Sequence, residues 1–381
     1  MSENEAPVLA EVRNGIGHLT LNRASGLNAL TLPMVRLLQQ QLTAWEQDET
    51  VVAVVLRANG EKAFCAGGDI RMLYDSHTSG ANQHLIFLEE EYALDACIHR
   101  YPKPVMALMD GFVLGGGMGL VQGASLRVIT ERTRMGMPET GIGFFPDVGG
   151  SYFLPRLPGE LGLYLGVTGI QARAADALYA GLADYCIAAD QLAELDRRLD
   201  DLDWTGADPH QALRTLLTTL GSDKLTGSEL KALRPAIDEL FALPDLPAIR
   251  AALLAETRPS FQDWAEETVK VLDSRSPLAM SVTLELLRRG RSLTLEDCFA
   301  QELHLDYQWF DKGDLIEGVR ALIIDKDKQP HWNPAHLNEL APERVQSFFV
   351  GLKPVSGRTS SATLDPTTPN AKGEASCTTS N

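Results

Sequence analysis

Two hydrophobic patterns alternate along the first half of the chain. Short runs of aliphatic residues, such as 51–56, are typical of strands buried on both faces of a parallel sheet. Between these runs, apolar residues recur at helical spacing over 28–45 and 84–100. The full pattern predicts strands at 8–12, 17–21, 51–56, 104–109 and 126–130, the first two joined by a turn at Asn14-Gly15. Alternating strands and helices predict an α/β fold.

The pattern changes after residue 188. Amphipathic helices are expected there, at 190–202, 213–220, 249–257, 261–272, 278–289 and 295–310. The last residues contain almost no large apolar side chain, so they cannot bury enough surface to offset their conformational entropy. We therefore expect an α/β core at 1–187, a helical region at 188–350 that closes the active site or forms a subunit contact, and a disordered tail at 351–381. No internal sequence repeat is evident.

Charge and cysteine usage narrow the possible partners. The formal net charge is −17, which argues against binding to nucleic acid or to an anionic membrane surface. The 5 cysteines lie far apart without a CxxC motif, so we expect no disulfide framework and no zinc site. The apolar runs are shorter than the ~20 residues that cross a bilayer. The acidic start lacks a signal-peptide pattern, and a cytoplasmic location is expected.

Two glycine-rich segments are candidates for binding through backbone N–H groups. The first, 63–69, contains consecutive small residues that let a ligand approach the backbone, although an ordinary tight turn is the simpler interpretation. The second places Gly115–Gly117 between a buried strand and an apolar helix, where each glycine costs ~1 kcal/mol relative to alanine. Either the helix start faces a polarised oxygen or the glycines permit tight packing. Leu120 breaks the GxGxxG dinucleotide pattern, and no Walker A lysine follows.

Two acids lie in an apolar loop at 137–150. Glu139 and Asp147 have phenylalanine, isoleucine and methionine neighbours, and burial prepares a carboxylate for acid or base catalysis. The alternatives are a helix cap for Asp147 and a surface position for Glu139. Glu91 ends a run of three glutamates, which by itself indicates a solvated helix face. No GxSxG nucleophile motif and no HExxH metal motif occurs.

Taken together and in order, three of these segments resemble the crotonase (enoyl-CoA hydratase/isomerase) superfamily. They are 64–69 (Phe-Cys-Ala-Gly-Gly-Asp), 110–117 (Asp-Gly-Phe-Val-Leu-Gly-Gly-Gly) and 137–139 (Met-Pro-Glu). The resemblance implies a crotonase-like spiral of ββα units that binds a coenzyme A thioester. It also implies an oxyanion hole formed by the N–H groups of Gly68 and Gly116, each of which contributes roughly 10²–10³ in rate.

A narrower resemblance concerns the reaction. Hydratases of the superfamily have a glutamate two residues after the glycine triplet, and that position here is Gly119. The segments 137–150, 151–157, 317–327 and 330–334 are instead similar to the 3-hydroxyisobutyryl-CoA hydrolase subfamily of valine breakdown. The subfamily's substrate-contacting residues match Glu91, Gly116, Glu139 and Asp147.

The resemblance implies hydrolysis of a β-hydroxyacyl-CoA thioester, most simply 3-hydroxyisobutyryl-CoA. Glu139 would act either as a base on water or as a nucleophile, and Asp147 would orient the substrate hydroxyl or water and assist the leaving thiolate. No metal and no separate cofactor is expected, because coenzyme A is part of the substrate. A homo-oligomer is expected as a possible assembly. Two alternatives stay open: a hydratase or isomerase acting on another acyl-CoA, and a non-catalytic acyl-CoA-binding protein.

Overall fold

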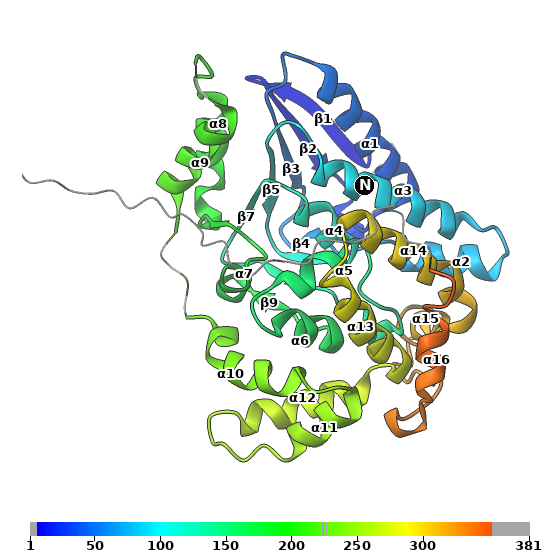
Figure 1. Cartoon of the computed structure of the whole chain (residues 1–381). Coiled ribbons are helices and arrows are strands. Elements are labelled where there is room, and N and C mark those ends of the chain that lie inside the picture. Colours follow the sequence, from blue (N-terminus) through cyan, green and yellow to red (C-terminus); the bar gives the residue numbers. More distant parts are fainter. Residues whose placement is uncertain (1–5, 207, 223–224, 226, 353–381) are drawn as a thin grey trace, which may run out of the picture.

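The computed structural model describes residues 6–206, 208–222, 225 and 227–352. Two sheets form its centre (Figure 1). The larger has six strands in the order β1 (Val8–Arg13), β2 (Ile16–Leu21), β3 (Ala53–Ala58), β5 (Val105–Met109), β7 (Leu126–Ile129) and β10 (Tyr185–Cys186). The smaller has the order β4 (Ala63–Cys65), β6 (Phe112–Leu114), β8 (Arg134–Gly136) and β9 (Ala172–Arg173). Only the β1–β2 and β8–β9 pairs within these described sheets are antiparallel.

Consecutive strands alternate between the two sheets. The chain passes from β3 to β4, from β5 to β6 and from β7 to β8, each time from the larger sheet to the smaller. Helices follow the first two pairs: α2 (Ile70–Thr78) and α3 (Gln83–His99) after β4, and α4 (Gly116–Gln122) after β6. This confirms the expected α/β fold with a crotonase-like ββα spiral.

The parallel arrangement of β4, β6 and β8 positions the site. These strands are neighbours in the smaller sheet and run in the same direction. Their carboxyl ends therefore lie at one edge of the sheet. The chain leaves these strands at Ala66, Gly115 and Met137, each of which lies in one of the three segments singled out in the sequence.

Alternate side chains of the larger sheet enter two different cores. In β5, Met106 and Leu108 face one side, where α8 (Leu192–Asp200) and α9 (Pro209–Leu220) cover the sheet. Val105, Ala107 and Met109 belong to the second core on the other side. That core is continuous with the later helices: α10 (Glu229–Phe241), α11 (Leu246–Leu254), α12 (Gln262–Ser274), α13 (Pro277–Gly290), α14 (Leu295–Lys312) and α15 (Leu315–Val319).

The expected helical region after residue 188 is present. Its helices α13 and α14 pack against α3, α5 (Gly150–Phe153) and α6 (Leu161–Thr168), which belong to the first half of the chain (Figure 1). The division at residue 187 remains a prediction about folding units. Of the predicted tail, residues 353–381 lie outside the described residues. No helix in the described ranges is both long and apolar enough to cross a membrane.

The first helix begins later than the sequence pattern predicts. The expected helix at 28–45 is α1 (Leu32–Gln47), because Leu27 and Asn28 adopt left-handed backbone angles, with φ of 54° and 53°. The buried Asn28 amide donates to the carbonyl oxygens of Asn59 and Ala63, both at 2.9 Å. Asn28 thus fixes the start of the β4 segment and cannot continue a helix.

Several short elements were not predicted. The glycine-rich segment 63–69 begins with β4, and the segment 110–117 contains β6 before the start of α4. β8, α2 and α10 were also missed. The short strands carry too few residues for a clear period, and Pro235 lies inside α10, where proline argues against a helix.

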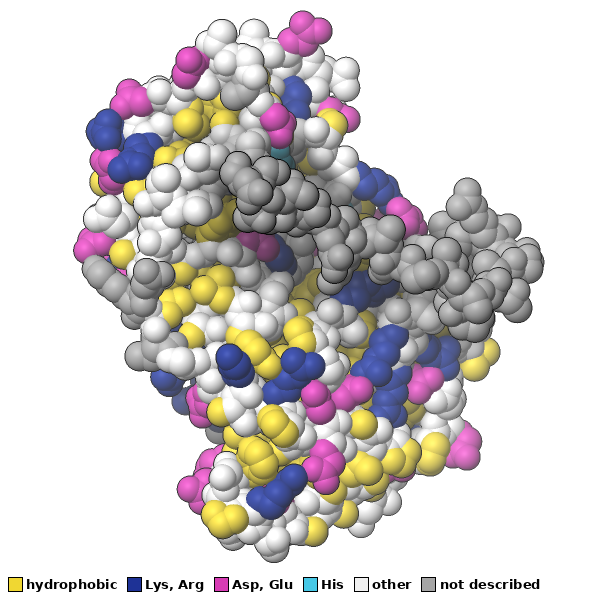
Figure 2. Space-filling view, turned by 60° about the vertical axis from the view of Figure 1, so that its left-hand side comes forward, with side chains coloured by type: hydrophobic (Ala, Val, Ile, Leu, Met, Phe, Trp, Pro, Cys, Tyr) yellow, Lys and Arg dark blue, Asp and Glu magenta, His cyan; other side chains and the backbone are white. Residues whose placement is uncertain are grey.

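Acidic and basic side chains are interspersed over the face shown in Figure 2. Many arginines of the described chain are paired with a nearby carboxylate. The net negative charge is therefore not gathered on this face as a single acidic patch.

Gly318 connects the helical region to the site. α15 packs on the short 3₁₀ helix Glu139–Ile142, and a Cβ atom at Gly318 would lie 2.0 Å from the Ile142 carbonyl oxygen. We expect Gly318→Ala to lower the free energy of unfolding by about 1–3 kcal/mol, because backbone must move to admit the methyl group. Urea denaturation measures this loss. Gly221→Ala is the matched control, since its Cβ would meet its nearest atom at 3.5 Å; equal losses in both variants would contradict the packing argument.

Candidate active site

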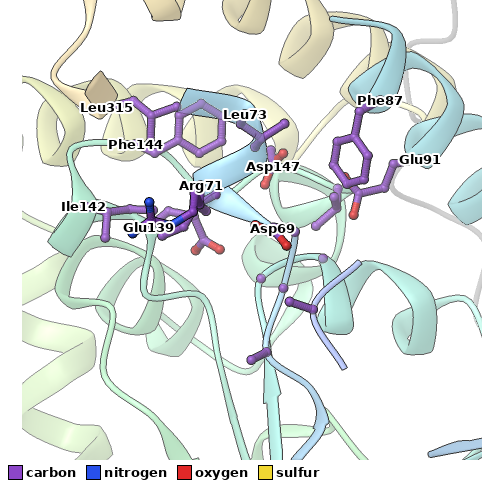
Figure 3. A pocket seen from close by; sticks show the side chains of 18 of the residues that line it. Asp69, Arg71, Leu73, Phe87, Glu91, Glu139, Ile142, Phe144, Asp147 and Leu315 are labelled. Carbon is purple, nitrogen blue, oxygen red and sulfur yellow. The ribbon is translucent and has the colours of Figure 1, made fainter. Parts of the chain in front are cut away.

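A cavity of about 440 Å³ lies at the shared edge of β4, β6 and β8. Figure 3 shows side chains from distant parts of the chain around it. All five residues singled out in the sequence line this cavity: Gly68, Glu91, Gly116, Glu139 and Asp147. Leu315, Leu322 and Ile323 from the helical region also line it, so that region helps to close the site. The chemical roles of these residues remain predictions.

Two backbone N–H groups are available at the cavity wall. Leu30 N donates to Gly67 O, and Asp69 N donates to Leu30 O. These two bonds of the bridge flank Gly68 and do not use its N–H group. Gly116 begins α4, and the N–H groups of a first helical turn have no acceptor within the helix. A Cβ built on Gly116 would lie 3.4 Å from Gly68 N, which shows how closely the two segments approach. This closeness is what an oxyanion hole formed by the two N–H groups requires.

Glu139 is the first residue of the 3₁₀ helix that follows β8. Its side chain is buried, and a Cβ at Gly115 would lie 2.7 Å from its Oε1 atom. Glu139 Oε2 has no hydrogen-bond partner among the described residues. Burial raises the pKa of this carboxyl well above its ordinary value, and the charge of Asp147 raises it further. Such a carboxyl is a strong base when it ionises.

Asp147 is held by a strained turn. The next residue, Val148, is buried with φ of 49°, an unusual angle for a β-branched side chain. The helix that follows has Gly149 as its N-cap residue and no side-chain cap, so Asp147 does not serve as the cap. Burial raises the pKa of Asp147 to about 7, although a hydrogen bond from Tyr92 opposes this increase.

Glu91 is buried on α3, so the solvated-face interpretation of its charge run is wrong for this residue. Its Oε1 atom has no partner in the described part of the chain, and a Cβ at Gly116 would lie 2.3 Å from it. Burial and then the charge of Asp95 raise the pKa of Glu91 well above its usual value. The absence of a side chain at Gly116 makes room for this carboxyl.

Gly119 occupies the position where hydratases of the family carry a second glutamate. A Cβ here would lie 2.5 Å from Asp95 Oδ2 and 2.7 Å from Val148 Cβ. Asp95 and Val148 therefore fill the space that a glutamate at residue 119 would need. The position of the missing glutamate is therefore occupied by other side chains and is not an empty space.

Sequence reasoning missed a second layer of buried polar residues behind Asp147. Tyr92 on α3 lies between Asp147 and Asp306, and Glu302 accepts hydrogen bonds from the N–H groups of Gly149 and Ser151, both at 2.8 Å. Glu302 and Asp306 are one turn apart on the buried face of α14. Acids placed among the apolar positions of an amphipathic helix were the signal that could have identified them.

A metal site is not evident in the described residues, where no cluster of three His, Cys, Asp or Glu side chains could hold an ion. The expectation that no cofactor is needed stays a prediction.

The raised pKa of Asp147 predicts a specific pH dependence of stability. Its ordinary value is 3.8 and its folded value about 7, so the native state retains a proton that the unfolded state loses. Stability contributed by this group is full below pH ~4 and is lost as the pH rises toward ~7. We expect Asp147→Asn to gain unfolding free energy relative to the parent between pH 5 and pH 8.

Urea denaturation at both pH values checks this expectation, with Asp263→Asn as a control at an exposed site. A difference between Asp147→Asn and the parent that stays constant with pH would contradict it.

The chain is similar to known proteins over most of its length. The profile of the family described as enoyl-CoA hydratase/isomerase matches residues 16–349. The mitochondrial 3-hydroxyisobutyryl-CoA hydrolase of Gallus gallus is 37% identical over 355 residues, covering 92% of this chain and 90% of that protein. Its counterpart from Homo sapiens is 36% identical over 346 residues, covering 91% and 89%. These relatives are named as mitochondrial, so they do not support the expected cytoplasmic location.

Two solved structures are also similar over nearly the whole chain. A carnitinyl-CoA dehydratase from Mycobacterium thermoresistibile has a TM-score of 0.83 and 38% identity, covering 93% of this chain and 98% of that one. An enoyl-CoA hydratase from Rhodobacter sphaeroides 2.4.1 has a TM-score of 0.81 and 36% identity, covering 92% and 98%. The matched profile, the relatives and the shared ββα spiral lead to one conclusion: this chain belongs to the enoyl-CoA hydratase/isomerase family.

Proposed function

We propose that this protein hydrolyses the thioester of 3-hydroxyisobutyryl-CoA to 3-hydroxyisobutyrate and free CoA, a reaction of valine breakdown. The observation that carries the proposal is the arrangement of one cavity. Gly68 and Gly116, whose N–H groups have no acceptor among the described residues, line it together with Glu139 and Asp147. Gly119 stands in place of the second hydratase glutamate. The relatives named 3-hydroxyisobutyryl-CoA hydrolase support the same substrate.

The reaction requires stabilisation of a tetrahedral intermediate. The thioester oxygen accepts hydrogen bonds from Gly68 N–H and Gly116 N–H, so the negative charge that develops there meets fixed donors. Glu139 lines the same cavity, so its carboxyl group is available to the carbonyl carbon of a thioester held there. Apolar side chains of Leu73, Phe87 and Phe144 surround this region and favour a short branched acyl group.

Glu139 can act by either of two routes. In the first it removes a proton from water, the hydroxide attacks the carbonyl carbon, and the C–S bond breaks to release the CoA thiolate. In the second the Glu139 carboxylate attacks, CoA leaves, and water hydrolyses the resulting anhydride at the Glu139 carbonyl carbon. A single turnover in ¹⁸O water distinguishes the routes, because only the second places ¹⁸O in the Glu139 side chain.

Asp147 and Glu91 bind the polar end of the acyl group. Both are buried, and both line the cavity (Figure 3). Asp147 orients the 3-hydroxyl group or the attacking water and assists the thiolate, whose thiol has an ordinary pKa near 8.5 and so needs little acid assistance. Arg23 and Arg71 are the two basic residues lining the cavity, and they supply positive charge for the CoA phosphates.

The dehydratase and hydratase names of the two solved structures favour a second candidate, the addition of water to an enoyl-CoA. This candidate retains Glu139 as its base. It conflicts with Gly119, whose surroundings leave no space for the second glutamate. Thiol release and loss of enoyl absorbance, measured on the same preparation, separate the two reactions.

We expect Glu139→Gln to remain folded but to lose at least about 100-fold in the rate of CoA release from 3-hydroxyisobutyryl-CoA, since the amide can neither accept the water proton nor attack. A thiol reagent measures the release, and Glu90→Gln is the control, because this half-buried residue of α3 pairs with Arg36 and does not line the cavity. Unchanged turnover in Glu139→Gln would remove this residue from the mechanism. Rapid enoyl-CoA hydration without thiol release would favour the second candidate.

A further inference from the structure

The hydroxyl group of Tyr92 lies between two buried carboxyl groups. Its oxygen is 2.6 Å from Asp306 Oδ2 and 3.1 Å from Asp147 Oδ2. Asp147 lines the cavity, whereas Tyr92 and Asp306 do not. We propose that Tyr92 and Asp306 are a positioning pair for Asp147: neutral Asp306 donates its proton to the Tyr92 oxygen, so that Tyr92 donates its own hydrogen to Asp147 Oδ2. The proposal rests on the hydrolase function proposed above.

The hydrogen count restricts the possible arrangements. A phenol has one O–H hydrogen and can donate to only one of the two carboxyl groups. If both contacts are hydrogen bonds, one carboxyl group must be protonated and must donate to the phenolic oxygen. The question is therefore which aspartate carries that proton.

Asp306 is the better candidate for the neutral member. It is fully buried on α14, and its Oδ1 atom has no partner in the described structure. An ionised Asp306 would be an almost unsolvated charge near Asp147 and Glu302, and such a charge is costly. Burial, followed by the charge of Asp147, raises the pKa of Asp306 well above its usual range.

The consequence for Asp147 is positional. Because Tyr92 donates to Oδ2, that oxygen is fixed as an acceptor, and the titrating proton of Asp147 resides on Oδ1. Asp147 therefore exchanges its proton with the substrate through one defined atom. The bond from Tyr92 also lowers the pKa of Asp147 against the effect of burial.

Other charged groups also surround this pair. From α3 come Glu91 and Asp95, from the 3₁₀ helix Glu139, from α14 Glu302, and from the rim of the cavity Arg23, Asp69 and Arg71. Of the described side chains, only Tyr92 has a hydrogen bond to the Asp147 carboxyl oxygens. Tyr92 therefore differs from these charged groups in acting on Asp147 through a directed bond.

The test is the pH profile of CoA release from 3-hydroxyisobutyryl-CoA. Asp147→Asn first identifies the limb of the profile that depends on Asp147. In Tyr92→Phe we expect kcat to fall about 10-fold. We also expect the midpoint of the Asp147-dependent limb to shift to higher pH by about one unit, because the lost hydrogen bond stabilised the Asp147 anion. KM for the CoA ester should stay within about twofold of the parent, because Tyr92 does not contact substrate.

Asp306→Asn tests the proton assignment. The amide is neutral, as we propose Asp306 to be, and it can donate to Tyr92, so the Asp147 limb should not move. If Asp306 were ionised, the substitution would remove a nearby negative charge and move the limb to lower pH, which would overturn the proposal. An unchanged profile in Tyr92→Phe would overturn it as well.

Tyr164→Phe is the matched control. Tyr164 is a buried tyrosine that accepts a hydrogen bond from Trp264 at 2.9 Å and does not line the cavity. Its loss should leave the pH profile unchanged even if the melting temperature falls. A limb that moved equally in Tyr164→Phe would indicate a general structural effect and would contradict a specific role of Tyr92.

A second measurement does not depend on turnover. Infrared spectra of protein labelled with ¹³C-aspartate separate the C=O stretch of a protonated carboxyl from the bands of carboxylates. Asp95 and Asp147 also have raised pKa values and contribute to this absorption. We therefore expect one component of the band at pH 7 to be lost in Asp306→Asn while the rest remains. If this component is found but the parent protein releases no CoA, the proposed function fails while the positioning pair stands. If the band is unaffected by Asp306→Asn, the pair is wrong regardless of activity.

Discussion

The close approach of two backbone segments determines what this cavity can do. A Cβ at Gly117 would lie 2.6 Å from the Cys65 carbonyl oxygen, and one at Gly116 would lie 2.3 Å from Glu91 Oε1. Only glycine lets the start of α4 rest against the end of β4. That contact brings the segments of Gly68 and Gly116 together at the cavity, and the parallel strands β4, β6 and β8 bring Glu139 to the same edge. Each glycine lowers the stability of α4 by ~1 kcal/mol relative to alanine. The close contact between the two segments accounts for this cost, because no larger residue fits there.

The second constraint is the concentration of acids around this site. Glu91, Asp95, Glu139, Asp147 and Asp306 are buried on neighbouring elements, and burial raises the pKa of each of them. Few of these groups can be ionised at the same time, because each charge opposes the next. Protons are therefore stored close to the reacting carbonyl. This arrangement lowers stability at neutral pH and gives the site groups that gain and lose protons near the working pH.

The sequence predicted those parts of the site whose signal is local. Glu139 and Asp147 were recognised because acids stood among apolar neighbours, and Gly116 because three glycines opened a helix. Features that depend on distant partners were missed. The helix α1 starts later than expected because Asn28 bonds to residues 31 and 35 positions away. Tyr92 gains its importance from Asp306, on a helix more than 200 residues later. No local pattern contains such contacts. Glu91 was identified only through the family resemblance, because its run of three glutamates indicated a solvated helix face.

A crystal structure with a ketone analogue of 3-hydroxyisobutyryl-CoA, in which CH₂ replaces the thioester sulfur, tests the account most directly. The account predicts that the ketone oxygen lies about 2.7–3.2 Å from both Gly68 N and Gly116 N, with the Glu139 carboxylate facing the carbonyl carbon. An oxygen bound away from these two N–H groups, or a Glu139 side chain directed out of the cavity, would contradict the account.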